Sequence, residues 1–131
     1  MGKVLLVTGG SRGLGAAICR LGARDGYDVA INYAGRADAA ESVAVEVRAA
    51  GRRAITIQAD IGDEHAVAAM FDRCAADLGP VDAFVSNAGI IHKAAPLADI
   101  AVDEIRRIVD VDLTAHLVCC REAVRRMSTK R

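Results

Sequence analysis

The chain has 131 residues, of which 53% are hydrophobic and 3% aromatic, and its 17 basic residues balance its 17 acidic ones. This length fits one domain with an aliphatic core, so we expect a single domain over residues 1–131. The balanced charge gives no electrostatic reason to expect a nucleic acid or an anionic membrane as partner. No apolar run reaches the roughly 18 residues of a membrane span, so we expect a cytoplasmic protein.

Short β-rich runs alternate with longer helical patterns along the chain. The predicted strands cover residues 3–8, 28–33, 53–59 and 81–86. The predicted helices cover residues 14–24, 37–50 and 64–78, and after a loop at 87–96 a last helical region follows in two segments that meet near Val109. Helical crossovers imply parallel strands with helices on both faces. We therefore predict an α/β fold, a Rossmann-type doubly wound sheet of order 3-2-1-4 that is incomplete at four strands.

Apolar residues recur at helical spacing in three of these helices. Asp63 is positioned to cap the third helix, Gly51 follows the second, and Gly79-Pro80 ends the third. The apolar stripes comprise Val43, Ala44, Val47 and Ala50 in the second helix, Val67, Met70, Phe71, Cys74 and Leu78 in the third, and Val109, Leu113, Leu117, Cys120 and Val124 in the last.

The four cysteines have no C-x-x-C spacing. Cys19, Cys74, Cys119 and Cys120 are therefore expected to be reduced thiols that pack as small hydrophobes, rather than a disulfide or a zinc site. His116 is close in sequence to two of them, but a fourth ligand is lacking. We predict no metal site.

A glycine-rich segment lies directly after the first predicted strand and opens the first helix. It reads Thr8-Gly9-Gly10-Ser11-Arg12-Gly13-Leu14-Gly15. Gly9 allows a sharp turn out of the strand, while Gly13 and Gly15 let a pyrophosphate approach the backbone and the helix pack closely on the sheet. The helix amino terminus then faces the anion. The alternative, a glycine turn without a ligand, is disfavoured by three glycines at these offsets.

The end of the second predicted strand indicates which dinucleotide would bind. Sites specific for NAD place an acidic residue there, to bond the ribose 2′-OH. This chain has Asn32 and Tyr33 instead, followed by Arg36, and Arg12 lies in the glycine loop. Two guanidinium groups suit a 2′-phosphate, and Asn32 adds a neutral donor. We predict NADP(H) as the preferred cofactor and NAD(H) as the alternative; the two arginines would otherwise be ordinary solvated charges.

Three later motifs follow in order, the first two directly after the third and fourth predicted strands and the last in the helical region that follows. They are Asp60-Ile61, Asn87-Ala88-Gly89 and Val111-Asp112-Leu113-Thr114. Taken singly, Asp60 reads as a cap at a helix start and Asn87-Ala88-Gly89 as a turn. Together with the T-G-x-x-x-G-x-G loop, they make the chain resemble the amino-terminal half of the short-chain dehydrogenase/reductase family. The resemblance implies that Asp60-Ile61 contacts adenine and that the Asn87 motif lies near the nicotinamide ribose.

The resemblance also implies a Ser, Tyr and Lys for catalysis, which would all fall beyond Arg131. Neither Tyr27 nor Tyr33 has a lysine four positions later. The family's catalytic Asn aligns with Asp112, which keeps the shape but not the amide donor. His92, Lys93 and His116 are the other candidates for proton transfer; we expect the first two to be solvated loop residues.

We therefore expect an NADP(H)-dependent alcohol/carbonyl oxidoreductase whose chain ends early, as a truncated product or fragment. The alternatives are a non-catalytic nucleotide-binding module and an interaction protein that retains the fold. The substrate, a small alcohol or carbonyl compound, stays unknown. The resemblance also implies self-association, because the family helix that corresponds to the last helix of this chain commonly packs against a partner subunit.

Overall fold

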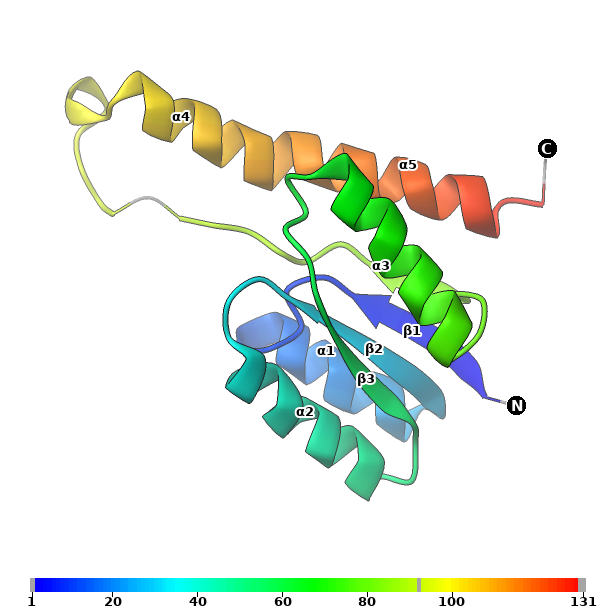
Figure 1. Ribbon diagram of the computed structural model, residues 1–131. Helices are drawn as coiled ribbons and strands as arrows, with labels where there is room; N and C mark the ends of the chain where they lie inside the picture. Colours follow the sequence, from blue (N-terminus) through cyan, green and yellow to red (C-terminus); the bar gives the residue numbers. More distant parts are fainter. Residues whose placement is uncertain (1, 92, 130–131) are drawn as a thin grey trace.

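The computed structural model describes residues 2–91 and 93–129. The described residues form one parallel sheet of four strands in the order β3-β2-β1-β4 (Figure 1). The strands are β1 (Lys3–Val7), β2 (Tyr27–Tyr33), β3 (Ala54–Gln58) and β4 (Ala83–Val85). The predicted α/β class and strand order are confirmed, since each crossover between parallel strands contains a helix.

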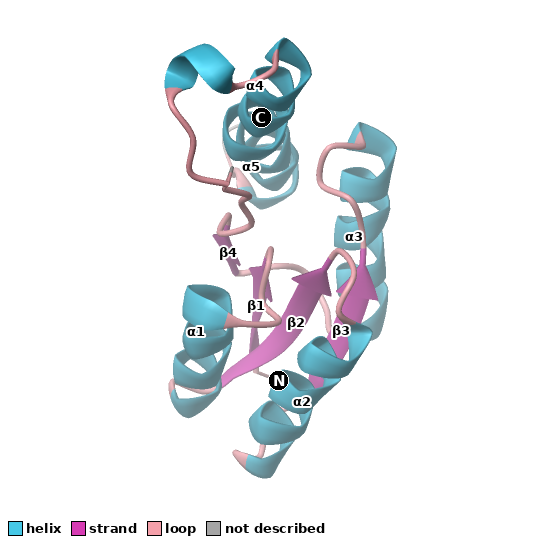
Figure 2. Ribbon diagram, turned by 90° about the vertical axis from the view of Figure 1, so that its left-hand side faces the viewer, coloured by secondary structure: helices cyan, strands magenta, loops and turns pink. Residues whose placement is uncertain are grey.

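Helices cover both faces of the sheet (Figure 2). One face packs against α1 (Gly13–Arg24) and α2 (Ala37–Ala49), and the other against α3 (Glu64–Asp77) and α5 (Ala115–Met127). Alternate residues of β1 divide between the two cores, with Leu5 and Val7 in one and Val4 and Leu6 in the other. The central strands therefore bury both of their faces, as the continuous aliphatic run at the amino terminus predicts.

The third helix begins and packs as its sequence predicts. The Asp63 carboxylate accepts hydrogen bonds from the backbone N–H groups of His65 at 2.9 Å and Ala66 at 3.3 Å. All five residues of its predicted apolar stripe are buried. In the second helix Val43, Ala44 and Val47 are buried too, but Ala50 is the exposed C-cap residue. The helix ends there because Gly51 adopts a φ of +85°.

The last helical region is almost continuous. After the 3₁₀ turn η1 (Leu97–Asp99), α4 (Val102–Val109) leads through the π turn η2 (Asp110–Thr114) into α5. The two predicted segments do meet at Val109. Figure 1 shows that α5 lies beside α3 over the sheet, whereas α4 extends past it. The buried face of α5 comprises Ala115, Cys119 and Ala123.

The predicted apolar stripe of the last helix lies on the opposite side and is exposed. We call Val109, Leu113, Leu117, Cys120 and Val124 the outer face. Of the four cysteines, Cys120 alone is exposed; Cys19, Cys74 and Cys119 are buried, all four are free thiols, and burial raises the pKa of Cys19 to about 12. The described helices include none that is both long and apolar enough to cross a membrane.

The prediction of a strand over residues 81–86 is wrong in length, because only three of these residues pair with β1. Just before β4, Asp82 forms the hydrogen bonds to β1 in a different way. Its backbone N–H donates to the Val4 carbonyl at 2.9 Å, but its side-chain carboxylate, and not a backbone carbonyl, accepts from the Val4 N–H at 2.8 Å. At the other end the N–H of Asn87 donates to the Thr8 hydroxyl at 2.9 Å instead of a backbone carbonyl. At both ends of β4, a side-chain oxygen therefore accepts the hydrogen bond that a backbone carbonyl would accept in a longer strand.

A buried carboxylate joins the beginning of β2 to the segment before β3. Asp28 accepts hydrogen bonds from the backbone N–H and from Nε of Arg53, both at 3.0 Å, and lies 3.0 Å from a guanidinium nitrogen of Arg52. Burial raises the pKa of Asp28, but the hydrogen bonds from Arg53 and the charges of both arginines outweigh it, so the pKa is lowered from the usual value.

The replacement Asp28→Asn should lower the free energy of unfolding at neutral pH by about 1–3 kcal/mol, because it removes a charge-assisted acceptor from a buried place. Since the folded-state pKa is lowered, the carboxylate stabilises the fold above its unfolded pKa near 3.8 and loses this effect as the pH falls through the folded value. Urea titrations of both proteins between about pH 7 and 3 should therefore converge at low pH. The exposed Asp25→Asn is the control; a gap between Asp28→Asn and wild type that is independent of pH would contradict the assignment.

Candidate functional site

A pocket of about 610 Å³ lies at the carboxyl ends of the strands, where parallel α/β sheets bind ligands. The loops after all four strands contribute to it, and so do α4 and the π turn. Of the sequence-predicted site residues it is lined by Gly9, Ser11, Arg12, Asn32, Tyr33, Arg36, Asp60, Ile61, Asn87, Ala88 and Gly89. Residues from four separate loops, spread over about 80 positions of sequence, are thus brought together.

The glycine loop takes a shape that side chains would prevent. Gly9 and Gly13 have φ values of +62° and +57°. A Cβ on Gly9 would lie 2.8 Å from the Cα of Ala88, and one on Gly15 would lie 2.1 Å from the carbonyl oxygen of Gly9. The predicted roles in turning and close packing therefore apply to Gly9 and Gly15, whereas Gly13 serves through its backbone conformation.

The amino terminus of α1 lies at the edge of the pocket, because its N-cap residue is among the lining residues. Arg12 is the N-cap residue, and within the described part of the chain no side chain bonds to the first turn as a cap. The N–H groups of a first helical turn lack partners inside the helix, so they suit an anion. Leu14, also predicted as a site residue, is 78% exposed and does not line the pocket.

Thr8 and Asn87 join the glycine loop to the loop after β4. The buried Thr8 hydroxyl accepts from the N–H groups of Asn87 at 2.9 Å and Ala88 at 3.2 Å. In return the Asn87 amide donates to the carbonyls of Thr8 at 3.2 Å and Gly9 at 3.0 Å. Thr8 thus shapes the pocket from below without lining it. The Asn87 motif is more than an ordinary turn, because the side chain of Asn87 is hydrogen-bonded to the glycine loop.

Asn32 has a different role from the one expected. Its amide donates to the carbonyls of Ile57 at 3.2 Å and Ala59 at 3.3 Å, and its side-chain oxygen accepts from the N–H of Gly9 at 3.2 Å. An amide has two donor hydrogens, and both are used within the protein. The expectation that Asn32 offers a donor to a 2′-phosphate is therefore wrong. Asn32 instead fixes the glycine loop against β2 and β3.

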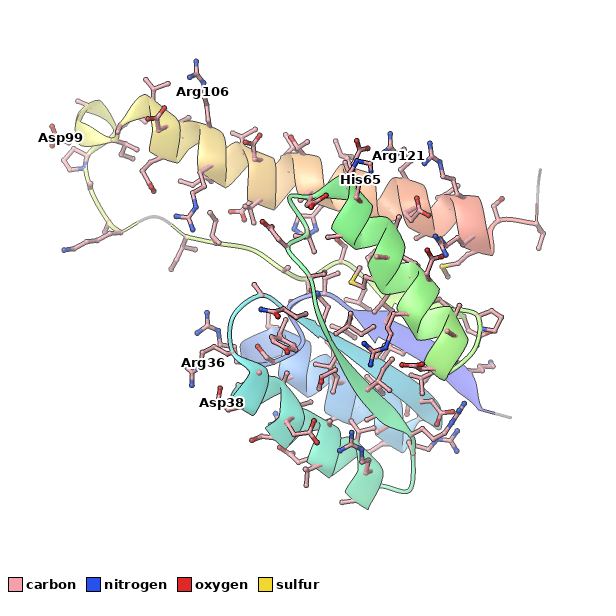
Figure 3. The ribbon with its side chains drawn as sticks, viewed as in Figure 1. Arg36, Asp38, His65, Asp99, Arg106 and Arg121 are labelled. Carbon is pink, nitrogen blue, oxygen red and sulfur yellow. The ribbon has the colours of Figure 1, made fainter. Side chains whose placement is uncertain are left out.

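The two predicted arginines both line the pocket, but one of them has a partner. The guanidinium of Arg36 bonds to the carboxylate of Asp38 in the first turn of α2, with both contacts at 3.3 Å (Figure 3). This pairing raises the pKa of Arg36 and lowers that of Asp38. No acidic residue follows Tyr33 directly, yet Asp38 brings a carboxylate close to Arg36, which the sequence pattern did not indicate.

Asp60 is not the cap of the third helix, since Asp63 has that role. One carboxylate oxygen of Asp60 accepts from the N–H of Gly62 at 2.9 Å, which orients the exposed side chain at the pocket wall. Ile61 beside it is buried and lines the pocket as well. An oriented acceptor next to an apolar side chain suits the polar edge and the flat face of a purine ring.

Asp112, the residue at the family's Asn position, lies in the π turn. Its carboxylate accepts from the N–H of Ile90 at 2.8 Å, and a Cβ on Gly89 would lie 3.3 Å from the same oxygen. Asp112 therefore performs a task that an Asn oxygen can also perform, namely to hold the loop after β4 against the long helix. It does not itself line the pocket.

Of the other candidates for proton transfer, the two that the structure describes, Lys93 and His116, do not line the pocket. The imidazole of His116 is hydrogen-bonded to the Ser86 hydroxyl, and neither residue lines the pocket. Lys93 is exposed, and His92 lies outside the described residues. Within residues 2–91 and 93–129 there is no group of three side chains that could hold a metal ion.

Sequence reasoning missed several lining residues. They are Ala34, Gly35, Ala59, Ile90, Arg107 and Val111. Most of these are neighbours of predicted residues, so a wider motif would have included them. Arg107 has no such signal, because only the direction of α4 over the strand ends brings it to the pocket.

Residues 3–131 match the family model described as short chain dehydrogenase. An uncharacterized oxidoreductase of Escherichia coli is 42% identical over 127 residues, which are 97% of this chain and 51% of that protein. The cis-4-hydroxycyclohexanecarboxylate dehydrogenase of Sinomonas cyclohexanicum is 43% identical over 126 residues, which are 96% of this chain and 50% of that protein. The chain spans about half the length of these curated relatives.

A solved structure has the same fold. The short chain dehydrogenase of Burkholderia cenocepacia, solved in complex with NADP, superposes with a TM-score of 0.90 at 46% identity, over 97% of this chain and 51% of that chain. The strand order, the glycine loop and the family match over nearly all residues agree with one another. This chain therefore belongs to the short-chain dehydrogenase/reductase family.

Proposed function

We propose that this chain binds NADP(H) in the pocket at the strand ends and forms the cofactor-binding part of an alcohol/carbonyl oxidoreductase. The observation that carries the proposal is the composition of the pocket beside β2, where Tyr33, Ala34, Gly35 and Arg36 line the wall and Arg12 faces the same space. A guanidinium group bonds a phosphate through a planar pair of donors. The NADP bound to the Burkholderia cenocepacia relative supports this choice.

Each part of the pocket suits one part of the cofactor. The uncapped amino terminus of α1 would bind the pyrophosphate, Arg12 and Arg36 the 2′-phosphate, and Asp60-Ile61 the adenine. The loop Asn87-Ala88-Gly89 would border the nicotinamide ribose, with Asn87 holding it to the glycine loop and Asp112 holding Ile90 behind it. When bound, the cofactor would donate a hydride to a carbonyl compound in its reduced form and would accept one from an alcohol in its oxidised form.

Within residues 1–131 no tyrosine has the lysine neighbour that the family resemblance implies for proton transfer. Tyr27 and Tyr33 lie at the two ends of β2, and neither is followed by the lysine that would lower its pKa. The runner-up function is a non-catalytic nucleotide-binding module, which would bind the cofactor without turnover. The third, an interaction protein that does not bind nucleotide, would be favoured by a failure to bind either cofactor.

The isolated protein should bind NADPH more tightly than NADH. Replacing Arg36 with Ala should weaken NADPH binding by about 1–3 kcal/mol, because a charge-assisted contact with the 2′-phosphate is lost, while NADH binding should stay nearly unchanged. Asp38→Asn should act in the opposite direction, since it frees Arg36 from its present partner. Isothermal titration calorimetry of each variant gives these affinities.

The control for this series is Arg20→Ala. Arg20 is also an arginine paired with a carboxylate, that of Glu46 at 2.6 Å, but it does not line the pocket. Equal affinity of the wild type for NADPH and NADH would refute the cofactor preference. An Arg36→Ala variant that behaves like Arg20→Ala would refute the role of Arg36.

Residues 1–131 alone should not reduce aldehydes or ketones. A positioned general acid is worth roughly 100- to 10,000-fold in rate, and the described residues that line the pocket include no histidine, lysine or Tyr–Lys pair to provide one. The measurement is NADPH oxidation followed by absorbance, on protein whose intact mass is verified, with and without a panel of carbonyl compounds. Turnover clearly above the rate without protein would overturn the expectation and favour a different acid.

We also propose that two copies associate through the outer face of the last helix. Burying a large apolar side chain is worth about 1.5–3 kcal/mol, so several exposed ones favour contact with a second copy. The short edge strand β4, with one side unpaired in the sheet, adds a second surface prone to association. The isolated chain is therefore expected to be marginally stable.

Leu117→Asp should reduce self-association in light scattering at micromolar concentration, because it places a charge within the outer face. Leu21→Asp on α1 is the matched control, since Leu21 is 56% exposed and Leu117 64%, but on different faces of the molecule. A monodisperse wild-type monomer that melts sharply above about 60 °C would contradict both the association and the marginal stability.

A further inference from the structure

Arg107 reaches the cofactor pocket from a wall that the glycine loop and the β2 loop do not form. It lies in the last turns of α4, and it lines the pocket together with Val111 of the π turn. The other two lining arginines, Arg12 and Arg36, come from the opposite side, where α1 and α2 begin. The pocket is thus bordered by guanidinium groups on both sides.

The charges around the pocket are unequal. The described residues that line it include three arginines and one carboxylate, that of Asp60, one oxygen of which already accepts from Gly62. The carboxylates of Asp38 and Glu104 lie close to two of these arginines but do not line the pocket. A concave site lined mainly by one sign of charge concentrates ligands of the opposite sign. The surplus of positive charge therefore fits a ligand with several phosphate charges better than a neutral one.

The guanidinium of Arg107 is held only loosely in its present position. The carboxylate of Glu104, one helical turn earlier, lies 3.9 Å from it, and the side chain of Arg107 is 65% exposed. Exposed pairs at this separation contribute little, so an incoming phosphate can replace the contact at small cost. By comparison, Arg36 makes two hydrogen bonds to Asp38 that a phosphate would have to replace.

We propose that Arg107 is a cofactor-binding residue that contacts a phosphate of the bound dinucleotide from the α4 side of the pocket. This inference rests on the proposed binding of NADP(H) and adds a third cation to that site. A dinucleotide offers two kinds of phosphate, the pyrophosphate and the 2′-phosphate. The planar fork of the guanidinium suits either, and the two are separated by comparing NADPH with NADH.

The neighbouring residue provides a matched control. Arg106 is also exposed and lies on the same helix, but it does not line the pocket, and Figure 3 shows it pointing away from the sheet. A general effect of lowering the net charge of α4 would be the same for both residues. Only a contact inside the pocket distinguishes Arg107 from Arg106.

The test is calorimetric titration of NADPH and NADH into the wild type and into the variants Arg107→Gln, Arg107→Lys and Arg106→Gln. Arg107→Gln should weaken NADPH binding roughly 3- to 10-fold at low salt, and this loss should shrink as salt is added, as expected for a screened charge contact. Arg107→Lys should recover most of the affinity, and Arg106→Gln should stay within about two-fold of the wild type. A loss with NADPH only identifies the 2′-phosphate as the partner, and an equal loss with both cofactors identifies the pyrophosphate.

Thermal melts of the four proteins show whether the variants remain folded; because Arg107 is exposed, we expect equal midpoints. The proposal is overturned if Arg107→Gln binds NADPH as the wild type does, or if its loss equals that of Arg106→Gln. It is also overturned if the loss is insensitive to salt, since that result would indicate stacking on adenine. Failure of the proposed function looks different, because the wild type itself would then bind neither cofactor.

Discussion

The hydrogen bonds of Thr8, Asn32 and Asn87 hold the carboxyl ends of the sheet in one arrangement. Parallel strands diverge at their ends, and the loops that follow them carry backbone groups without ladder partners. Thr8 and Asn87 satisfy such groups between β1 and β4, and Asn32 does so between the glycine loop and β3. All three are neutral, so they can be buried without the desolvation cost of a charge. The pocket lies between the loops that these hydrogen bonds hold in place.

Much of this arrangement could be predicted because the signals were local. A glycine after an apolar stripe, as at Gly51, or an acid just before one, as at Asp63, has its effect within a single turn of helix. The alternation predicted a parallel sheet with helices on both faces, because helical crossovers restrict such sheets to few topologies. The order 3-2-1-4 followed from the Rossmann-type glycine loop, since another common doubly wound sheet has the same alternation. The candidate site residues came together for the same reason: they occupy corresponding positions after successive strands.

What the sequence could not predict depends on distant partners. Asp82 shortens β4 because its carboxylate meets Val4, 78 positions earlier, and Asn32 loses its donors to carbonyls of β3 and the residue after it. Neither fact is visible in a local pattern. Arg36 does line the pocket, but the competing charge of Asp38 depends on side-chain geometry. To predict that Arg107 lines the pocket, one would have to know the direction in which the whole of α4 runs over the strand ends.

The π turn explains how one nearly straight helix serves two different surroundings. Arg107, Val111, Ala115, Cys119 and Ala123 are spaced by four residues; the first two line the pocket and the last three pack in the core. In a regular α-helix, four residues turn by about 40° more than a full turn. Over the four steps from Arg107 to Ala123, the direction of the side chain would therefore rotate by about 160° around the helix axis. The wider π turn at Asp110–Thr114 rotates less per residue and removes part of this rotation. One additional residue in the helix thus keeps the side chains that line the pocket on nearly the same side of the helix as those that pack in the core.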